Sequence, residues 1–280
     1  MTQRRIPLTL RLMRFAFAVA GTVVPGIAGR YACRLWFSTR RYPEPRRETA
    51  WRAQSIEKQI DHQGMPITIY EWGEGPTVLL LHGWNGRGTQ LGAFADPLAE
   101  AGFRAVAIDF PAHGRTPGNQ TNVFAITDAI MSVANTYKPI HAVISHSFGV
   151  FPTTMMLRHG LSMQRVVCIS PPDTVRWLME SFSKTLRIPY SAQKVMHRLL
   201  ERRFGHNIWD EVSALKNAAK LDTPALIIHD EHDHDVPIDR GKAVAAAWNG
   251  AQFVATKGLG HRRILRDAHV IAQTVKYISS

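Results

Sequence analysis

From residue 66 to the end of the chain, short apolar runs alternate with longer amphipathic segments. Runs of this length, rich in Val, Ile and Leu, predict strands, and the amphipathic segments between them predict helices. The predicted strands are Ile67–Glu71, Thr77–Leu81, Arg104–Asp109, His141–Ser145, Arg165–Ser170, Pro224–His229 and Gln252–Thr256. This alternation is typical of a largely parallel sheet with helices on both faces, and therefore of the α/β class.

Helical periodicity lies between these strands and follows the last one. The predicted helices are Leu91–Ala101, Phe124–Tyr137, Phe148–His159, Arg240–Trp248 and Arg263–Ile278. Gly102, Gly160 and Gly250 stand where three of them should end, since glycine is common just after a helix. With 280 residues, the chain has enough length for one sizeable core.

About fifty residues separate Pro172 from Pro224, and no strand is predicted among them. Apolar residues recur there at helical spacing, from Trp177 to Leu200. The segment is either additional helix covering the core or a small helical cap over an active site. We expect an N-terminal segment with its linker at 1–47, core at 48–172, a cap insertion at 173–215 and further core at 216–280.

The N-terminal segment combines basic and apolar residues. An apolar stretch of fifteen, Phe15–Gly29, lies between Arg14 and Arg30, and it is shorter than the about 20 residues that cross a bilayer as a helix. Three interpretations stay open: a shallow membrane anchor formed by residues 1–40, a helix packed on the body of the chain, or a cleaved signal. A Pro- and Arg-rich linker, Arg41–Arg47, follows.

The formal net charge of +12 is concentrated near the N-terminus. The first fifty residues hold ten arginines and two glutamates, for a net charge of +8, so the other 230 carry only +4. A nearly balanced body argues against a nucleic-acid partner, and a basic end beside apolar residues favours a membrane surface. The two cysteines, Cys33 and Cys168, are expected to be reduced structural thiols. We expect a cytoplasmic protein that associates with membranes, if at all, through its N-terminal segment.

The segment Ser145–His146–Ser147–Phe148–Gly149 joins a predicted strand to a predicted helix. A central serine between small residues at such a junction is typical of a nucleophile elbow, although Ser145 replaces the usual first glycine. A serine hydroxyl needs a base to take its proton and a carboxylate to orient that base. Both should follow in the order Ser, Asp or Glu, His.

Candidates for the acid and the base follow the last two predicted strands. His229–Asp235 holds three aspartates, and His261 ends the run Gly258–Leu259–Gly260–His261. With these residues the chain resembles the α/β-hydrolase superfamily over roughly residues 66–280. In that family the acid lies in a D-x-x-V-P turn, which here begins at Asp233. The resemblance therefore implies a triad of Ser147, Asp233 and His261.

Two further segments carry the resemblance. Leu80–Leu81–His82–Gly83–Trp84 is similar to the family loop that supplies one N–H of the oxyanion hole, which implies the backbone N–H of Trp84, and the second would be that of Phe148. Asp109–Thr116 resembles the family turn D-x-P-G-H-G-x-S, a structural mark. His82 and His113 are expected to hold loops by hydrogen bonds.

The resemblance implies hydrolysis of a carboxylic ester or thioester of a small molecule, without a cofactor and through an acyl-enzyme. A carbon–carbon bond hydrolase with the same triad and a non-catalytic binding protein of this fold are the alternatives. A metal site in the His- and Asp-rich segment 229–235 is disfavoured, because the acid turn already accounts for it. The sequence leaves the oligomeric state open.

Overall fold

The structure, a computed structural model, describes residues 7–280, and residues 1–6 of the predicted N-terminal segment lie outside the described part. The chain divides into two compact units. The helical unit contains the residues up to Ser38 together with Thr174–Glu211. The sheet unit contains Thr39–Asp173 and Val212–Ser280. All five residues of the predicted triad and oxyanion hole belong to the sheet unit.

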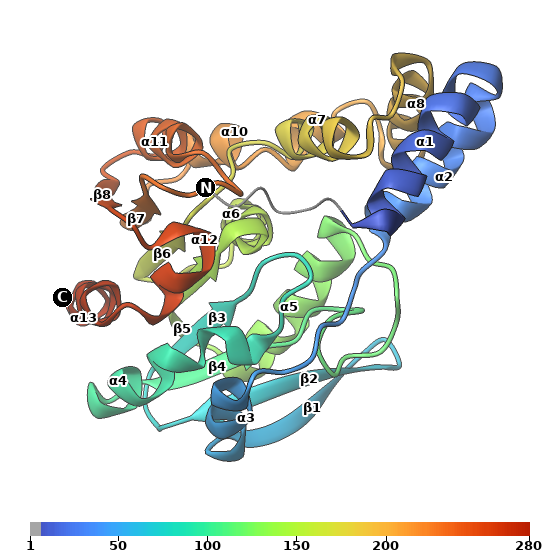
Figure 1. Ribbon diagram of the computed structural model, residues 1–280. Helices are drawn as coiled ribbons and strands as arrows, with labels where there is room; N and C mark the ends of the chain where they lie inside the picture. The colour runs from blue at the N-terminus through green and yellow to red at the C-terminus, as the bar shows by residue number, and fades with distance from the viewer. Residues whose placement is uncertain (1–6) are drawn as a thin grey trace. The chain divides into compact units, whose positions relative to one another are not determined.

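The sheet unit is built on one eight-stranded sheet (Figure 1). Its strands are β1 (Ile56–His62), β2 (Met65–Trp72), β3 (Thr77–Leu81), β4 (Arg104–Ile108), β5 (Ile140–His146), β6 (Arg165–Ile169), β7 (Ala225–Asp230) and β8 (Gln252–Thr256). They lie in the order β1-β2-β4-β3-β5-β6-β7-β8. β2 is antiparallel to both of its neighbours, and the strands from β4 to β8 are parallel. The predicted mostly parallel sheet is confirmed.

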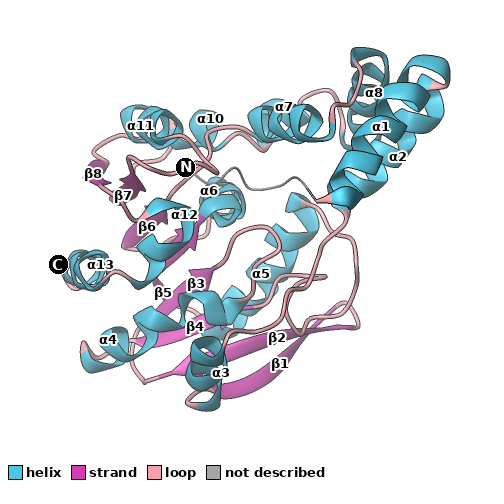
Figure 2. Cartoon of the chain, viewed as in Figure 1, coloured by secondary structure: helices cyan, strands magenta, loops and turns pink. Residues whose placement is uncertain are grey.

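Helices flank this sheet, as Figure 2 shows. They are α3 (Arg46–Ala53), α4 (Ala95–Glu100), α5 (Val123–Tyr137), α6 (Val150–Arg158), α10 (Ala214–Ala218), α11 (Ile238–Ala247), α12 (Gly260–Arg263) and α13 (Ala268–Ile278). Short 3-10 helices cover Gly88–Phe94, Ser147–Gly149 and Ile264–Arg266. The α/β class predicted from the apolar pattern is therefore the observed one.

Alternate strand residues form the core on one face of the sheet. Leu80, Ile144 and Val167 are fully buried there, in one cluster with Leu98 of α4 and Val270 of α13. Side chains of successive strand residues point to opposite faces, so the intervening residues need cover from the other layer. Every residue of β3 is buried, which fits a central strand that is covered on both sides.

The structure departs from the predicted elements at several points. β1 and α3 were not predicted at all, and α3 takes up the end of the expected linker Arg41–Arg47. The helix expected at Arg263–Ile278 is interrupted, because the Asp267 side chain accepts hydrogen bonds from the backbone N–H groups of His269 and Val270 and starts α13 anew. The helix expected at Leu91–Ala101 is a 3-10 helix followed by α4.

The helical unit contains α1 (Leu8–Val23), α2 (Pro25–Phe37), α7 (Val175–Leu186), α8 (Tyr190–Phe204) and α9 (Ile208–Glu211). The apolar stretch Phe15–Gly29 is divided between α1 and α2, with the break at Val24 before Pro25. α2 packs on α8, where the Cys33 thiol lies 3.6 Å from the carbonyl oxygen of Met196. The N-terminal segment thus packs against the insertion.

No helix within residues 7–280 is long and apolar enough to cross a membrane. The role of residues 173–215 as a cap remains a prediction.

Candidate active site

Ser147 stands at a sharp turn between strand and helix. It follows the last residue of β5, and its φ of 52° lies in the left-handed region. The 3-10 helix Ser147–Gly149 begins at this residue and leads into α6. Non-glycine residues seldom adopt this conformation. The cases in which they do are concentrated at functional sites. The nucleophile elbow predicted from the sequence has this geometry.

The residues flanking Ser147 explain how the turn is accommodated. A Cβ atom on Gly149 would lie 2.7 Å from the carbonyl oxygen of Leu81 and 2.8 Å from that of His82, so only glycine fits here. Ser145, in the place of the usual first glycine, is buried within β5, and its hydroxyl donates to the carbonyl oxygen of Val167 at 3.3 Å. Its hydroxyl therefore fits without disturbing the strand.

His261 and Asp233 converge on Ser147, although they lie 114 and 86 positions away in the chain. The Nε2 atom of His261 lies 3.0 Å from the Ser147 hydroxyl oxygen, and its Nδ1 atom lies 2.7 Å from Oδ2 of Asp233. A carboxylate only accepts, so Nδ1–H donates to Asp233 and the free lone pair of Nε2 faces the serine hydroxyl. The three residues form one hydrogen-bonded chain.

Asp233 is held rigidly by its own turn. Its Oδ1 atom accepts hydrogen bonds from the N–H groups of Asp235 at 2.9 Å and Val236 at 2.8 Å. The buried His229 has its Nε2 atom 3.5 Å from Oδ2 of Asp233. Burial raises the pKa of Asp233, but hydrogen bonds from His229, His261 and Val236 outweigh it and hold the pKa well below its usual range. The Asp233 carboxylate is therefore ionised at every pH at which His261 can act as a base.

Asp230, considered from the sequence only as a rejected candidate for the acid, fixes the loop that carries His261. Its Oδ1 atom accepts from the Gly260 N–H at 2.8 Å, and its Oδ2 atom accepts from the Leu259 N–H at 3.0 Å and the Thr256 hydroxyl at 2.8 Å. Burial raises the pKa of Asp230, and these hydrogen bonds lower it further than burial raises it. No sequence signal distinguishes this role, since the bonded groups lie 26 to 30 positions away.

His146 supports His261 from the other side. Its Nε2–H donates to the backbone carbonyl oxygen of His261 at 2.8 Å, and the two rings lie 4.7 Å apart. Burial, then the nearby His261, lower the pKa of His146 to about 3, so its ring is neutral. The acceptor lies 115 positions away in the chain, so no sequence motif marks this role.

Trp84, in the loop after β3, and Phe148, in the 3-10 helix that begins at Ser147, meet beside the serine. Their rings contact each other with centroids 4.9 Å apart, and a Cβ atom on Gly83 would lie 3.2 Å from Cβ of Ser147. The Phe148 N–H belongs to the first turn of a helix, where N–H groups lack an intrahelical acceptor. Donation by these two N–H groups to a substrate oxygen remains a prediction.

His82 and His113 hold loops through hydrogen bonds, as expected. His82 accepts the Phe110 N–H at 3.2 Å through Nε2, so its Nδ1–H donates to the Gly83 carbonyl oxygen at 2.7 Å. His113 donates from Nδ1 to the Pro111 carbonyl oxygen at 3.0 Å. Burial lowers the pKa of His82 well below its usual range and that of His113 to about 4. Both rings are therefore neutral. His82 links the loop of Trp84 to Phe110, and His113 holds the turn that starts at Asp109.

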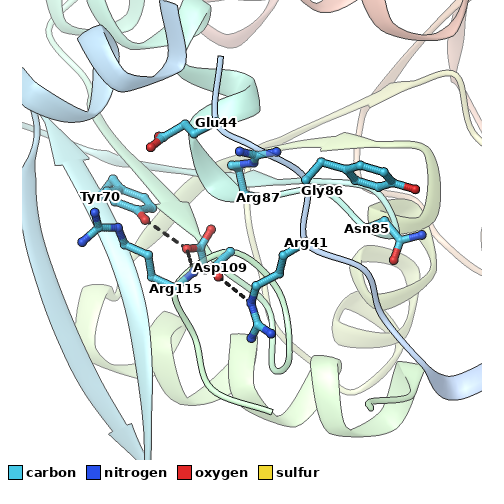
Figure 3. Close-up of a pocket in the computed structure, with 10 residues that line it drawn as sticks. Arg41, Glu44, Tyr70, Asn85, Gly86, Arg87, Asp109 and Arg115 are labelled. Carbon is cyan, nitrogen blue, oxygen red and sulfur yellow. Dashed lines mark hydrogen bonds between the residues drawn. The ribbon is translucent and has the colours of Figure 1, made fainter. Parts of the chain in front are cut away.

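A pocket of about 180 Å³ lies over the turn that starts at Asp109, and Figure 3 shows its lining. The Asp109 carboxylate accepts from the Tyr70 hydroxyl at 3.0 Å and from the Arg115 N–H at 2.7 Å. Arg41 donates to the carbonyl oxygens of Gly114, Thr116 and Gly118. The polar groups of this pocket therefore hold the turn together, in keeping with its interpretation as a structural mark.

Within residues 7–280, no three His, Cys, Asp or Glu side chains are grouped so that they could hold a metal ion. In the segment 229–235, His229, Asp230 and Asp233 take part in the hydrogen bonds described above. Their polar atoms brace the site and the loop of His261.

Comparison with known proteins finds a family model that matches most of the chain. A model of the alpha/beta hydrolase family matches residues 78–274. A search of the curated proteins gives no match.

Solved structures with the same fold are numerous. A thioesterase domain from the curacin biosynthetic pathway is 18% identical with a TM-score of 0.60, over 80% of this chain and 98% of that one. A bromoperoxidase from Bacillus anthracis is 16% identical with a TM-score of 0.62, over 80% and 99%. An esterase from Exiguobacterium antarcticum is 16% identical with a TM-score of 0.60, over 81% and 98%. At these identities the likeness concerns the fold.

Proposed function

This chain belongs to the alpha/beta hydrolase family, and on that premise we propose that it is a serine hydrolase that cleaves a carboxylic ester or thioester of a small molecule. One observation carries the proposal. Ser147, held at a φ of 52° on the elbow, has its hydroxyl oxygen 3.0 Å from Nε2 of His261, which in turn is bonded to the ionised Asp233. A binding protein would not need a serine that is held in a strained backbone conformation and hydrogen-bonded to a histidine base.

In the acylation step, Nε2 of His261 takes the hydroxyl proton as the Ser147 oxygen attacks the carbonyl carbon of the substrate. Asp233 stabilises the imidazolium that forms, and because its carboxylate is anchored by two backbone N–H groups it stays in place. The imidazolium then returns its proton to the leaving alcohol or thiol as the carbonyl re-forms. The product of this half-reaction is an ester of Ser147.

In the deacylation step, His261 takes a proton from water, and the resulting hydroxide attacks the acyl carbon. The proton returns to the Ser147 oxygen as the acid leaves, so no cofactor is consumed. His146 and Asp230 hold the histidine backbone and loop, so that one ring position serves both steps.

Both steps place negative charge on the former carbonyl oxygen. We assign its stabilisation to the backbone N–H groups of Trp84 and Phe148, for two reasons. The rings of Trp84 and Phe148 contact each other, and the Gly83–Trp84 segment runs directly beside Ser147. Each fixed donor of this kind contributes about 10² to 10³ in rate.

Labelling with a fluorophosphonate tests the nucleophile, because only an activated serine reacts at a useful rate. The purified chain is expected to be labelled once, with Ser147→Ala and His261→Ala unlabelled and Ser170→Ala, which changes a buried serine that follows β6, labelled like the parent. Failure of the folded parent chain to label would support a non-catalytic binding protein and reject the proposal.

Substrate class is tested separately, with a panel of p-nitrophenyl esters and acyl thioesters of different chain lengths. The parent should hydrolyse at least one of them, and Ser147→Ala should lower its rate to the background level. A chain that is labelled yet cleaves none of them, but cleaves a 1,3-diketone between carbons, would be a carbon–carbon bond hydrolase instead.

A further inference from the structure

Helix α1 presents a continuous row of large apolar side chains to solvent. Spacings of four, three, four and four residues place the row on one face of the helix. Its members, which we call the apolar stripe, are Leu8, Leu12, Phe15, Val19 and Val23, and their exposed fractions run from 50% to 74%. A helix on the surface of a globular protein ordinarily carries polar residues there, so the stripe needs an explanation.

The exposure of the stripe does not result from a loosely placed helix. The opposite face of α1 is buried within the helical unit, where Phe17 is only 4% exposed. A Cβ atom on Gly21 would lie 2.6 Å from the ring of Pro189, and the hydroxyl of Ser191 donates to the Gly21 carbonyl oxygen at 2.6 Å. These contacts fix the rotation of α1 about its own axis, and in this orientation the stripe faces solvent.

Helix α2, which begins after the break at Val24, also exposes apolar and basic residues. Ile27 is 64% exposed, and Tyr31, one turn later in α2, is 51% exposed. The exposed Arg30 and Arg34 lie three positions after each of them. The inner face of α2 is made of small residues such as Ala28 and Ala32, which pack closely in the helical unit.

The charged residues of the segment that carries the stripe have one sign. Between residues 7 and 43 the chain contains six arginines and no Asp or Glu. A pocket of about 340 Å³ within the helical unit is lined by Arg11, Arg14, Phe15, Ala18 and Arg187. The guanidinium of Arg14 is held there by donation to the Thr185 carbonyl oxygen at 2.8 Å. Three cations thus surround a cavity that Phe15, a member of the stripe, also lines.

We propose that the apolar stripe and this arginine pocket dock the chain on the surface of a bilayer that contains anionic phospholipid. Helix α1 lies in the plane of the interface with the stripe among the upper acyl chains, and the pocket takes the phosphate of a headgroup. A second copy of the chain would also cover the stripe, but it would bring the arginines of both copies together. An anionic lipid surface satisfies the apolar and the basic residues at once.

Docking is independent of the proposed hydrolase activity, and sedimentation with vesicles tests it. The full chain should bind vesicles of phosphatidylcholine with about 30% phosphatidylglycerol, and bind pure phosphatidylcholine much less. Phe15→Gln should weaken binding about tenfold, because it removes the apolar contact at the centre of the stripe. Arg11→Gln and Arg187→Gln should each weaken it about fivefold, and salt at about 0.5 M should abolish the preference for anionic vesicles.

Ile56→Gln is the matched control, since Ile56 is 62% exposed but lies on β1 of the sheet unit. It should bind vesicles like the parent, and all variants should keep the parent's melting temperature. Equal binding of Phe15→Gln and the parent, or no binding of the parent to anionic vesicles, would overturn the proposal. Sedimentation velocity showing a dimer that Phe15→Gln dissociates would also overturn it, in favour of a second copy as the occupant.

Discussion

The imidazole of His146 donates its Nε2 proton to the backbone carbonyl oxygen of His261 across 2.8 Å, and its Nδ1 atom is buried without a hydrogen-bond partner. The residue directly before the nucleophile thereby holds the backbone of the base. Ser147 and His261 come from elements 114 positions apart, so this bond ties the two loops whose spacing decides whether proton transfer is possible. His146 is a positioning residue, with no contact to reacting atoms required of it.

His146→Ala is expected to lower kcat and the fluorophosphonate labelling rate by about tenfold, which corresponds to the loss of one buried hydrogen bond. KM should change little, because His146 is assigned no contact with the substrate. Burial keeps the pKa of His146 at about 3, so the pH profile between 5 and 9 should keep its shape in the variant. Steady-state kinetics across that range check both points, and a displaced profile would instead mean that His146 exchanges protons in the reaction. His159→Ala, at an exposed position, is the control.

Asp233→Asn should lower kcat by about 10⁴, the loss known for the equivalent change in a serine protease triad, because the amide reverses the tautomer of the histidine. Substrate binding should be largely retained, so kcat falls and KM does not rise in proportion. Asp235→Asn is the matched control, since Asp235 contributes only its backbone N–H to Asp233. Turnover in Asp233→Asn within tenfold of the parent would exclude Asp233 as the partner of His261.

Asp230 is expected to contribute stability that depends on pH in a defined direction. Its folded pKa lies below the usual value of about 3.9, so the contribution is present above that value and is lost as the pH falls through the folded pKa. Asp230→Asn cannot accept all four hydrogen bonds, and leaving a buried donor unpaired should cost about 1 to 3 kcal/mol near neutral pH.

Urea unfolding of the parent and of Asp230→Asn between pH 7 and pH 3 measures that difference. The difference in the free energy of unfolding between the parent and the variant should narrow as the pH falls. Protonation of Asp230 removes from the parent the same charged hydrogen-bond acceptor that the substitution removes from the variant. A gap that stays constant down to pH 3 would show that the carboxylate charge does not matter to the loop of His261.

The strands that sequence reasoning predicted are largely buried, with the exception of β8. β3, in which every residue is buried, has its predicted bounds, and so does β8, although none of its residues is buried. β1 was missed because it is an edge strand of mostly exposed residues, Ile56–His62, with only two apolar side chains. α3 was missed because half of its residues are charged and they show no apolar periodicity. The residues it buries or half-buries are Glu48, Trp51 and Arg52.

Within the site, the residues that chain order and turn motifs mark were brought together by the fold. Asp230 and His146 were not given their roles, since each acts on the backbone of a loop that is distant in sequence. Almost every residue type offers the same backbone N–H and C=O groups, so hydrogen bonds to them cannot be predicted from the sequence and become visible only in the folded chain.

Gly149 should resist even the smallest substitution. In Gly149→Ala the added methyl group would lie 2.7 Å from the Leu81 carbonyl oxygen, so α6 and β3 would have to separate. We expect a loss of about 1 to 3 kcal/mol in the free energy of unfolding. The rate of fluorophosphonate labelling should also fall, since the same shift moves Ser147 away from His261. Gly26→Ala, where nothing lies within 4 Å of the new methyl group, should lower neither measurement. Unchanged labelling of a stably folded Gly149→Ala would mean that the serine tolerates a shift of its helix.

The two thiols should be inert in the folded chain. Burial raises the pKa of Cys33 to about 11 and that of Cys168 to about 12, so neither forms much thiolate at pH 8. Ellman's reagent should therefore react slowly with the folded chain in buffer. In denaturant it should titrate two equivalents of thiol per chain. Ser145 lies 3.7 Å from the Cys168 sulfur, so exposure of this thiol requires opening of the strand that leads into the elbow. If Cys168 reacts, the labelling rate of Ser147 should fall in step with it, because both depend on β5. Rapid modification of Cys168 with full retention of labelling would contradict the close packing of β5 and β6 beneath the nucleophile.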